Sequence, residues 1–141
     1  NLIFTTMKAT FYQEGTKFIY KVDGQKVRTS QRSTPYEYVA VRLKDGKFVK
    51  ILACGQEKTC IQAAIERKEG IRRMEVTLQY LAGEITYKQY LDRVGFSHAM
   101  CKSFFKEEVE REGMENVVRR YEESIARWSQ YTEEVIRFVK E

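Results

Sequence analysis

The residues best suited to chemistry lie between positions 22 and 41, in the stretch VDGQKVRTSQRSTPYEYVAV. Arginine binds phosphate through two parallel hydrogen bonds, so we expect Arg28 and Arg32 to hold the phosphates of a ligand, with Ser30 between them. Tyrosine rings offer a flat surface on which a base stacks, which makes Tyr36 and Tyr38 candidate platforms. These residue types predict the binding of an anionic, phosphate-bearing molecule.

Four residues further along the chain could complete such a site. Arg119 and Arg120 could share the phosphates, and Tyr87 and Tyr90 offer two more rings for a base. The candidate ligand-binding residues are thus Arg28, Ser30, Arg32, Tyr36, Tyr38, Tyr87, Tyr90, Arg119 and Arg120.

No part of the sequence has the spacing of a catalytic or metal site. The cysteines at positions 54, 60 and 101 form no CxxC pattern and are predicted to be small, buried, apolar side chains. His98 precedes Cys101 by three residues, but a nucleophilic pair also needs an orienting partner and an oxyanion hole, and the sequence shows neither. We therefore expect a protein that is not an enzyme and that holds no metal and no cofactor.

The composition is that of an ordinary globular protein. The 141 residues are 43% hydrophobic and 32% charged, and no apolar run approaches the ~20 residues of a membrane-spanning helix. We expect one soluble domain over residues 1–141, in a reducing cytoplasm because the cysteines are odd in number. Residues 1–6 do not resemble a signal peptide, and Met7 is a plausible native start.

The elements that must position the candidate residues begin with a sheet over residues 8–54. Asp23-Gly24 between two β-rich runs is a strong hairpin signal, and similar turns predict an antiparallel β-meander of about five strands: 8–13, 17–22, 25–29, 36–43 and 47–54. Alternation would place Lys26, Arg28, Ser30 and Arg32 in one row on one face. If the third and fourth strands pair, Tyr36 and Tyr38 lie on one face beside these arginines.

From residue 56 the apolar period changes from 2 to 3.6, which predicts short helices over 56–112. We expect one helix to end at Gly70, a second over 71–81, a third over 87–94 capped by Thr86, and a fourth from Ser97 to Glu112.

The remaining stretch, 114–140, has apolar residues at alternating spacings of four and three, which predicts one long amphipathic helix. Tyr121, Ile125, Trp128 and Val135 lie on its apolar stripe and are the candidate oligomer interface. The alternative is a helical hairpin within one chain. The predicted fold class is α+β, a meander followed by a helical half.

Positive charge is concentrated in the predicted sheet. Residues 1–50 contain ten Lys and Arg against four Asp and Glu, whereas the rest of the chain contains fifteen against sixteen. Such segregation on a tyrosine-bearing surface favours an anionic partner. The alternative is a solvated sheet face that lysines keep soluble.

The run VDGQKVRTSQR followed by YEYVAV, a second hairpin and a helical half resembles a class of short phage-encoded proteins, in particular the Thoeris anti-defence protein 1 family. The resemblance implies a homo-oligomer in the host cytoplasm that sequesters a nucleotide-derived immune signal, of the cyclic ADP-ribose type or a cyclic oligonucleotide, without cleaving it. The alternatives are a basic-sheet protein that binds nucleic acid or a nucleoprotein defence complex, as an anti-CRISPR or small regulator does, and a scaffold without a ligand.

Overall fold

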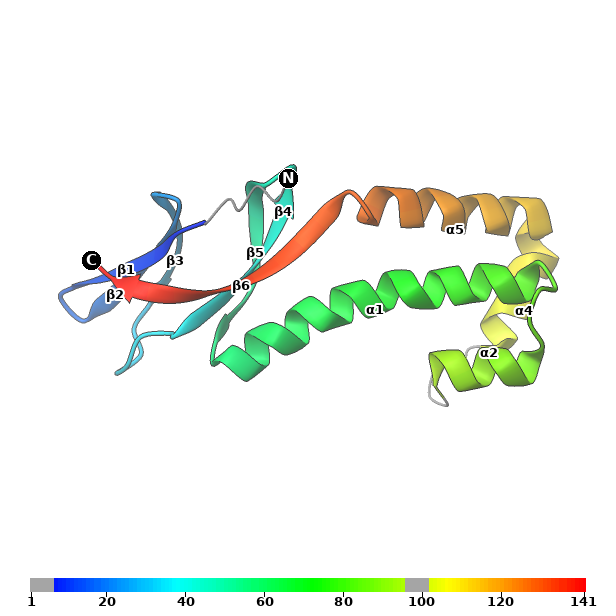
Figure 1. Ribbon diagram of the computed structural model, residues 1–141, viewed down its shortest axis with the longest axis horizontal. Coiled ribbons are helices and arrows are strands. Elements are labelled where there is room, and N and C mark those ends of the chain that lie inside the picture. The colour runs from blue at the N-terminus through cyan, green and yellow to red at the C-terminus, as the bar shows by residue number, and fades with distance from the viewer. Residues whose placement is uncertain (1–6, 96–101) are drawn as a thin grey trace, which may run out of the picture. The chain divides into compact units, whose positions relative to one another are not determined.

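The computed structural model describes residues 7–95 and 102–141, without the side chains of 102–106. In these residues five strands come first, then four helices and a last strand (Figure 1). They are β1 (Ala9–Glu14), β2 (Lys17–Val22), β3 (Gln25–Ser30), β4 (Tyr38–Lys44), β5 (Lys47–Gly55), α1 (Glu57–Leu81), α2 (Tyr87–Val94), α4 (Lys102–Glu112), α5 (Met114–Trp128) and β6 (Tyr131–Lys140). The predicted α+β class and its five N-terminal strands are confirmed.

The sheet has six strands in the order β3-β2-β1-β6-β4-β5. The last strand, β6, lies at its centre, where it pairs parallel with β1 and antiparallel with β4. β3 and β4 are therefore not neighbours, and the predicted pairing of these two strands is wrong. β6 therefore joins the group formed by β1, β2 and β3 to the hairpin formed by β4 and β5.

The prediction of one helix over 114–140 is wrong in its second half. α5 ends at Trp128, and residues 131–140 form β6. Pairing with strands on both sides satisfies the β6 backbone, and the same placement buries the Phe138 side chain. A helix here would have left β1 and β4 with unpaired edges.

The prediction that a helix ends at Gly70 is also wrong, because α1 runs unbroken from Glu57 to Leu81. Gly70 does not have the positive φ of a helix-terminating glycine. The prediction that Thr86 caps α2 is confirmed, since its side chain accepts a hydrogen bond from the backbone of Gln89 in a capping box. The predicted cap Ser97 lies outside the described residues.

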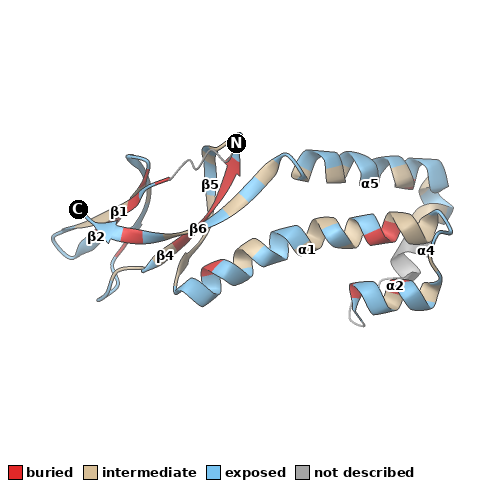
Figure 2. Cartoon of the chain, viewed as in Figure 1, coloured by how far each residue is buried: buried red, intermediate tan, exposed pale blue. Residues whose placement is uncertain are grey.

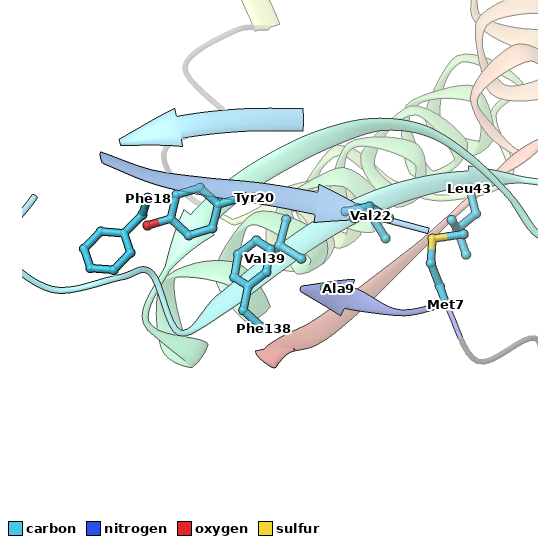
Figure 3. Close-up of a cluster of buried hydrophobic side chains, with 9 residues drawn as sticks. Met7, Ala9, Phe18, Tyr20, Val22, Val39, Leu43 and Phe138 are labelled. Carbon is cyan, nitrogen blue, oxygen red and sulfur yellow. The ribbon is translucent and has the colours of Figure 1, made fainter. Parts of the chain in front are cut away.

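The core of the sheet lies on one face, which we call the inner face. Its fully buried side chains include Tyr20, Val22, Val39 and Val41, with Phe138 from the central strand (Figure 3). Figure 2 shows buried residues along β4, which lies between β6 and β5. The opposite side is the outer face, where the start of α1 contacts β5. There the Cys60 thiol donates a hydrogen bond to the carbonyl of Ala53 at 3.7 Å.

The chain divides into two compact units. Unit 1 comprises Asn1–Arg67 and Gln130–Glu141, and unit 2 comprises Lys68–Ser129. Unit 2 has its own small core, centred on Val76, Tyr90 and Val94. None of the described helices is long and apolar enough to cross a membrane. The single-domain organisation stays a prediction.

Candidate functional site

A β-bulge divides the predicted row of cations between the two faces of the sheet. Arg28 pairs with Tyr20, but the next pair is Lys26 with Lys21, so Val27 is an extra residue in β3. Directly opposed residues share a face, so Arg28 lies on the inner side with Tyr20 and Lys26 lies on the outer side. The prediction of one continuous row is wrong, because the extra residue reverses the alternation.

Ser30 belongs to a buried hydrogen-bond network beneath the candidate site. Its Oγ lies 2.8 Å from the hydroxyl of Tyr20, and that hydroxyl also accepts the backbone N–H of Tyr36 at 3.0 Å. Tyr20 is fully buried and Ser30 is only 8% exposed. The network fixes the connection between β3 and β4 to the core, so Ser30 positions Tyr36.

Arg32 lies against the ring of Tyr36. The guanidinium carbon is 4.7 Å from the ring centroid, and the same ring packs against Tyr20 with 5.2 Å between centroids. Among the described residues, no carboxylate lies within 4.0 Å of the Arg32 guanidinium. Arg32 thus presents a charge without a carboxylate partner at the surface, on the half-buried ring of Tyr36, which in turn packs on the buried ring of Tyr20.

Arg28 lies where the two edges of the sheet approach each other. Arg28 is on β3 and Cys54 is on β5, and these are the two edge strands of the sheet. The charge of Arg28 and its side-chain hydrogen bond to the Cys54 thiol both lower the pKa of this thiol. The sheet is therefore close to a closed barrel. Burial dominates at Cys54 and raises its pKa to about 11. No described carboxylate lies within 4.0 Å of Arg28.

Tyr38 lies on the outer face, opposite Arg137 of β6. The guanidinium carbon of Arg137 is 5.9 Å from the ring centroid of Tyr38. A hydrogen bond to Glu57 raises the pKa of Tyr38. The prediction that Tyr36 and Tyr38 share a face is wrong, because β4 begins only at Tyr38 and the Tyr36 ring packs onto the inner-face core instead.

The other candidate ligand-binding residues lie in unit 2, where each has contacts of its own. Tyr87 and Tyr90 pack in a cluster with Tyr80, with centroids 5.1 to 6.4 Å apart, and Tyr90 is 2% exposed. Arg119 donates to the side chain of Asn116 at 2.6 Å. Arg120 makes ion pairs of 3.1 Å with both Glu108 and Glu112. The structure therefore gathers only Arg28, Ser30, Arg32 and Tyr36 on the inner side of unit 1.

The candidate oligomer residues also lie in two places. Tyr121, Ile125 and Trp128 are half-buried on α5, and the Tyr121 hydroxyl donates to Glu108 at 3.4 Å. Burial and the Glu108 charge raise the pKa of Tyr121 to about 12. Val135 is on β6, opposite Ala40 of β4. The single apolar stripe that was predicted to join all four does not exist, because the helix ends at Trp128.

Sequence reasoning overlooked three residues of the outer face, which are Tyr12, Lys21 and Arg137. Lys21 lies 5.0 Å from the ring centroid of Tyr12, and Arg137 accompanies Tyr38 as described. The alternation of residues 135–139 could have predicted a strand that places Arg137 on the outer face, because Ile136 and Phe138 on either side of it point inward. Among the described residues, no three His, Cys, Asp or Glu side chains are grouped as a metal site. His98 and Cys101 lie outside these residues.

We compared the chain with known protein families, with curated proteins and with solved structures. No family model, no curated protein and no solved structure matched it.

Proposed function

We propose that unit 1 binds a phosphate-bearing small molecule through Arg28 and Arg32, and that the protein sequesters this molecule without changing it. The observation that carries the proposal is the lack of a described carboxylate within 4.0 Å of either guanidinium. Arg28 is on the paired strand β3, and Arg32 follows this strand and packs on the Tyr36 ring. A guanidinium without a carboxylate partner is available for a bidentate contact with phosphate.

The charge of the two units supports the choice of unit 1. Unit 1 carries fourteen Lys and Arg against nine Asp and Glu, whereas unit 2 carries eleven of each. The whole net charge of +5 therefore belongs to unit 1. A phosphate group approaching unit 1 meets a favourable potential before it reaches a particular arginine.

The unit 2 arginines are less suited to the same task. Arg120 is already held by Glu108 and Glu112, and an anion would have to compete with both carboxylates. Arg119 is hydrogen-bonded to Asn116. We therefore leave Arg119, Arg120, Tyr87 and Tyr90 out of the proposed site.

Tyr36 has a supporting role in this proposal. Its ring packs against Tyr20 and holds the Arg32 guanidinium at 4.7 Å, which limits the orientations of the guanidinium plane. A preorganised arginine loses less conformational entropy on binding than a free one. Ser30 contributes indirectly, because its hydrogen bond to Tyr20 helps to fix Tyr36.

The resemblance described above provides the ligand class. We propose a nucleotide-derived signal, of the cyclic ADP-ribose type or a cyclic oligonucleotide, held by a non-catalytic phage protein in the host cytoplasm. Self-association is part of the same proposal, through Tyr121, Ile125 and Trp128 on α5. Val135 is no longer included, since it belongs to the sheet.

Calorimetric titration with cyclic ADP-ribose and with a cyclic dinucleotide tests the proposal. Arg28→Ala and Arg32→Ala should each weaken binding by about 1.5–3 kcal/mol, the range for hydrogen bonds to charged groups, with little change in thermal stability. Lysine at either position should restore only part of the affinity, because an ammonium lacks the planar fork. Lys140→Ala is a matched control, since Lys140 is another exposed cation of unit 1. Wild-type affinity in both arginine variants would remove this site.

A further inference from the structure

The outer face of the sheet presents a second set of cations and aromatic rings, and none of these residues belongs to the site proposed above. Alternation from the buried positions places Tyr12, Lys21, Lys26, Tyr38 and Arg137 on this face. We call these five residues the outer platform. They come from five different strands, and all of them belong to unit 1.

Both rings of the outer platform are half-buried, and each has a cation beside it. The Lys21 ammonium is 5.0 Å from the Tyr12 centroid, and the Arg137 guanidinium is 5.9 Å from the Tyr38 centroid. Val139 lies between these two pairs on β6, and it is 61% exposed, the most exposed of the large apolar side chains described. The platform thus combines stacking surfaces, positive charge and an uncovered apolar side chain.

Two lysines are directly opposed on this face, which is unfavourable for the isolated sheet. Lys21 of β2 pairs with Lys26 of β3, and like charges in such a pair destabilise a sheet. The Glu141 carboxylate lies 3.4 Å from the Lys21 ammonium and offsets one of the two charges. No described carboxylate lies within 4.0 Å of Lys26. A polyanion laid across the platform would compensate this remaining charge.

We propose that the outer platform binds single-stranded nucleic acid. The bases would stack on Tyr12 and Tyr38, and the phosphates would lie near Lys21, Lys26 and Arg137. Proteins that bind single strands combine cations that follow the backbone with rings on which bases stack. The outer platform extends across five neighbouring strands at a spacing of ~4.8 Å, which suits an extended strand better than a compact small molecule. A duplex keeps its base faces stacked inside and cannot use the rings.

Fluorescence anisotropy with the full chain and a labelled oligothymidylate of ~15 nucleotides tests this proposal, with an oligouridylate and a DNA hairpin of equal length beside it. The single strands should bind and the hairpin should bind at least tenfold more weakly. Tyr12→Leu and Tyr38→Leu should each weaken binding of the single strand by about 5- to 150-fold, the range for loss of one stacked base. The ratio of the DNA and RNA affinities shows which kind of strand is preferred.

Charge variants distinguish binding at the outer platform from a general attraction of the oligonucleotide to the positive charge of unit 1. Lys26→Gln and Lys140→Gln remove the same charge from unit 1, but Lys140 pairs with Phe11 and so lies on the inner side of β6. Lys26→Gln should reduce the slope of log affinity against log salt by ~0.7, while Lys140→Gln should leave it unchanged. Arg28→Ala and Arg32→Ala should bind the oligonucleotide as the wild type does, which distinguishes this platform from the inner site.

Several results would overturn the proposal. These are no binding of either single strand at low salt, equal binding of hairpin and single strand, and equal effects of Lys26→Gln and Lys140→Gln. Circular dichroism melts check that each variant is folded. If a leucine variant does not fold, Tyr12→Phe and Tyr38→Phe replace it, because a phenylalanine ring stacks as tyrosine does and should keep wild-type affinity. A loss of binding in these phenylalanine variants contradicts a stacking role.

Discussion

The hydroxyl groups of Tyr20 and Ser30 lie 2.8 Å apart inside the core, ten residues apart in sequence. The Tyr20 hydroxyl also accepts the backbone N–H of Tyr36. One buried hydroxyl therefore connects β2, β3 and the chain that leads to β4. Because Arg32 packs on Tyr36, this network lies directly beneath the proposed anion site.

Tyr20→Phe should lower the free energy of unfolding by about 1–3 kcal/mol, because it leaves Ser30 Oγ and the Tyr36 N–H without their partner in a dry environment. Urea denaturation followed by circular dichroism measures the change. Tyr12→Phe is the matched control, since Tyr12 is only half-buried and should change stability by less than ~0.5 kcal/mol. Equal stability of Tyr20→Phe and wild type would contradict a structural role for the network.

Gly70→Ala should stabilise the protein by about 0.5–1 kcal/mol. Gly70 lies within continuous α1 without a positive φ, and a Cβ there would meet no atom within 4 Å. Gly113→Ala is the opposite case, because Gly113 has φ +87° at the start of α5, and alanine is strained there. Thermal melts of the two variants should therefore move in opposite directions. Loss of stability in Gly70→Ala would indicate that α1 is interrupted after all.

Local patterns predicted the hairpins well, because their signals lie within a few residues. Asp23 and Gly24 both have positive φ, as the tight turn requires, and Asp45 and Gly46 repeat this. The strand boundaries followed from these turns to within one or two residues. The capping box at Thr86 was equally local.

The predictions that were wrong concern features that depend on residues distant in sequence. Tyr131, Val135 and Phe138 fit a helical spacing, but the same stretch is rich in β-branched and aromatic residues, and β1 and β4 decide its structure. The side of the sheet taken by Arg28 depends on a bulge that the sequence of β3 does not mark. The approach of Arg28 to Cys54 requires the curvature of the whole sheet, so no local pattern could have shown it.

Cys54 should react slowly with iodoacetamide at neutral pH, because burial raises its pKa to about 11 and only the thiolate reacts. Burial raises the pKa of Cys60 as well. Peptide mapping by mass spectrometry should show both thiols protected in the native protein and modified in urea. Fast modification of Cys54 in the folded protein would contradict its half-buried position and raised pKa.

The raised pKa of Cys54 also has a consequence for stability. The folded state holds the thiol proton more tightly than the unfolded state, whose thiol has a pKa near ~8.5. The contribution to stability is therefore complete below about pH 8.5 and is lost as the pH rises toward 11. Cys54→Ser lacks this titration, so the difference in urea midpoint between wild type and Cys54→Ser should shrink over that range. A constant difference would show that Cys54 does not titrate as described.

We expect the protein to self-associate through α5. Ile125 and Trp128 are large apolar side chains that are only half-buried in one chain, and such residues dominate helix interfaces when a second copy covers them. Light scattering should give a mass of at least twice the 16.7 kDa of one chain. Changing both residues to Asp should give monomers, whereas Ala126→Asp on the exposed side of α5 should leave the mass unchanged. Circular dichroism must show that the double variant keeps its helices. A monomeric wild type would mean that the α5 stripe serves only the core of unit 2, where Val117 is already fully buried.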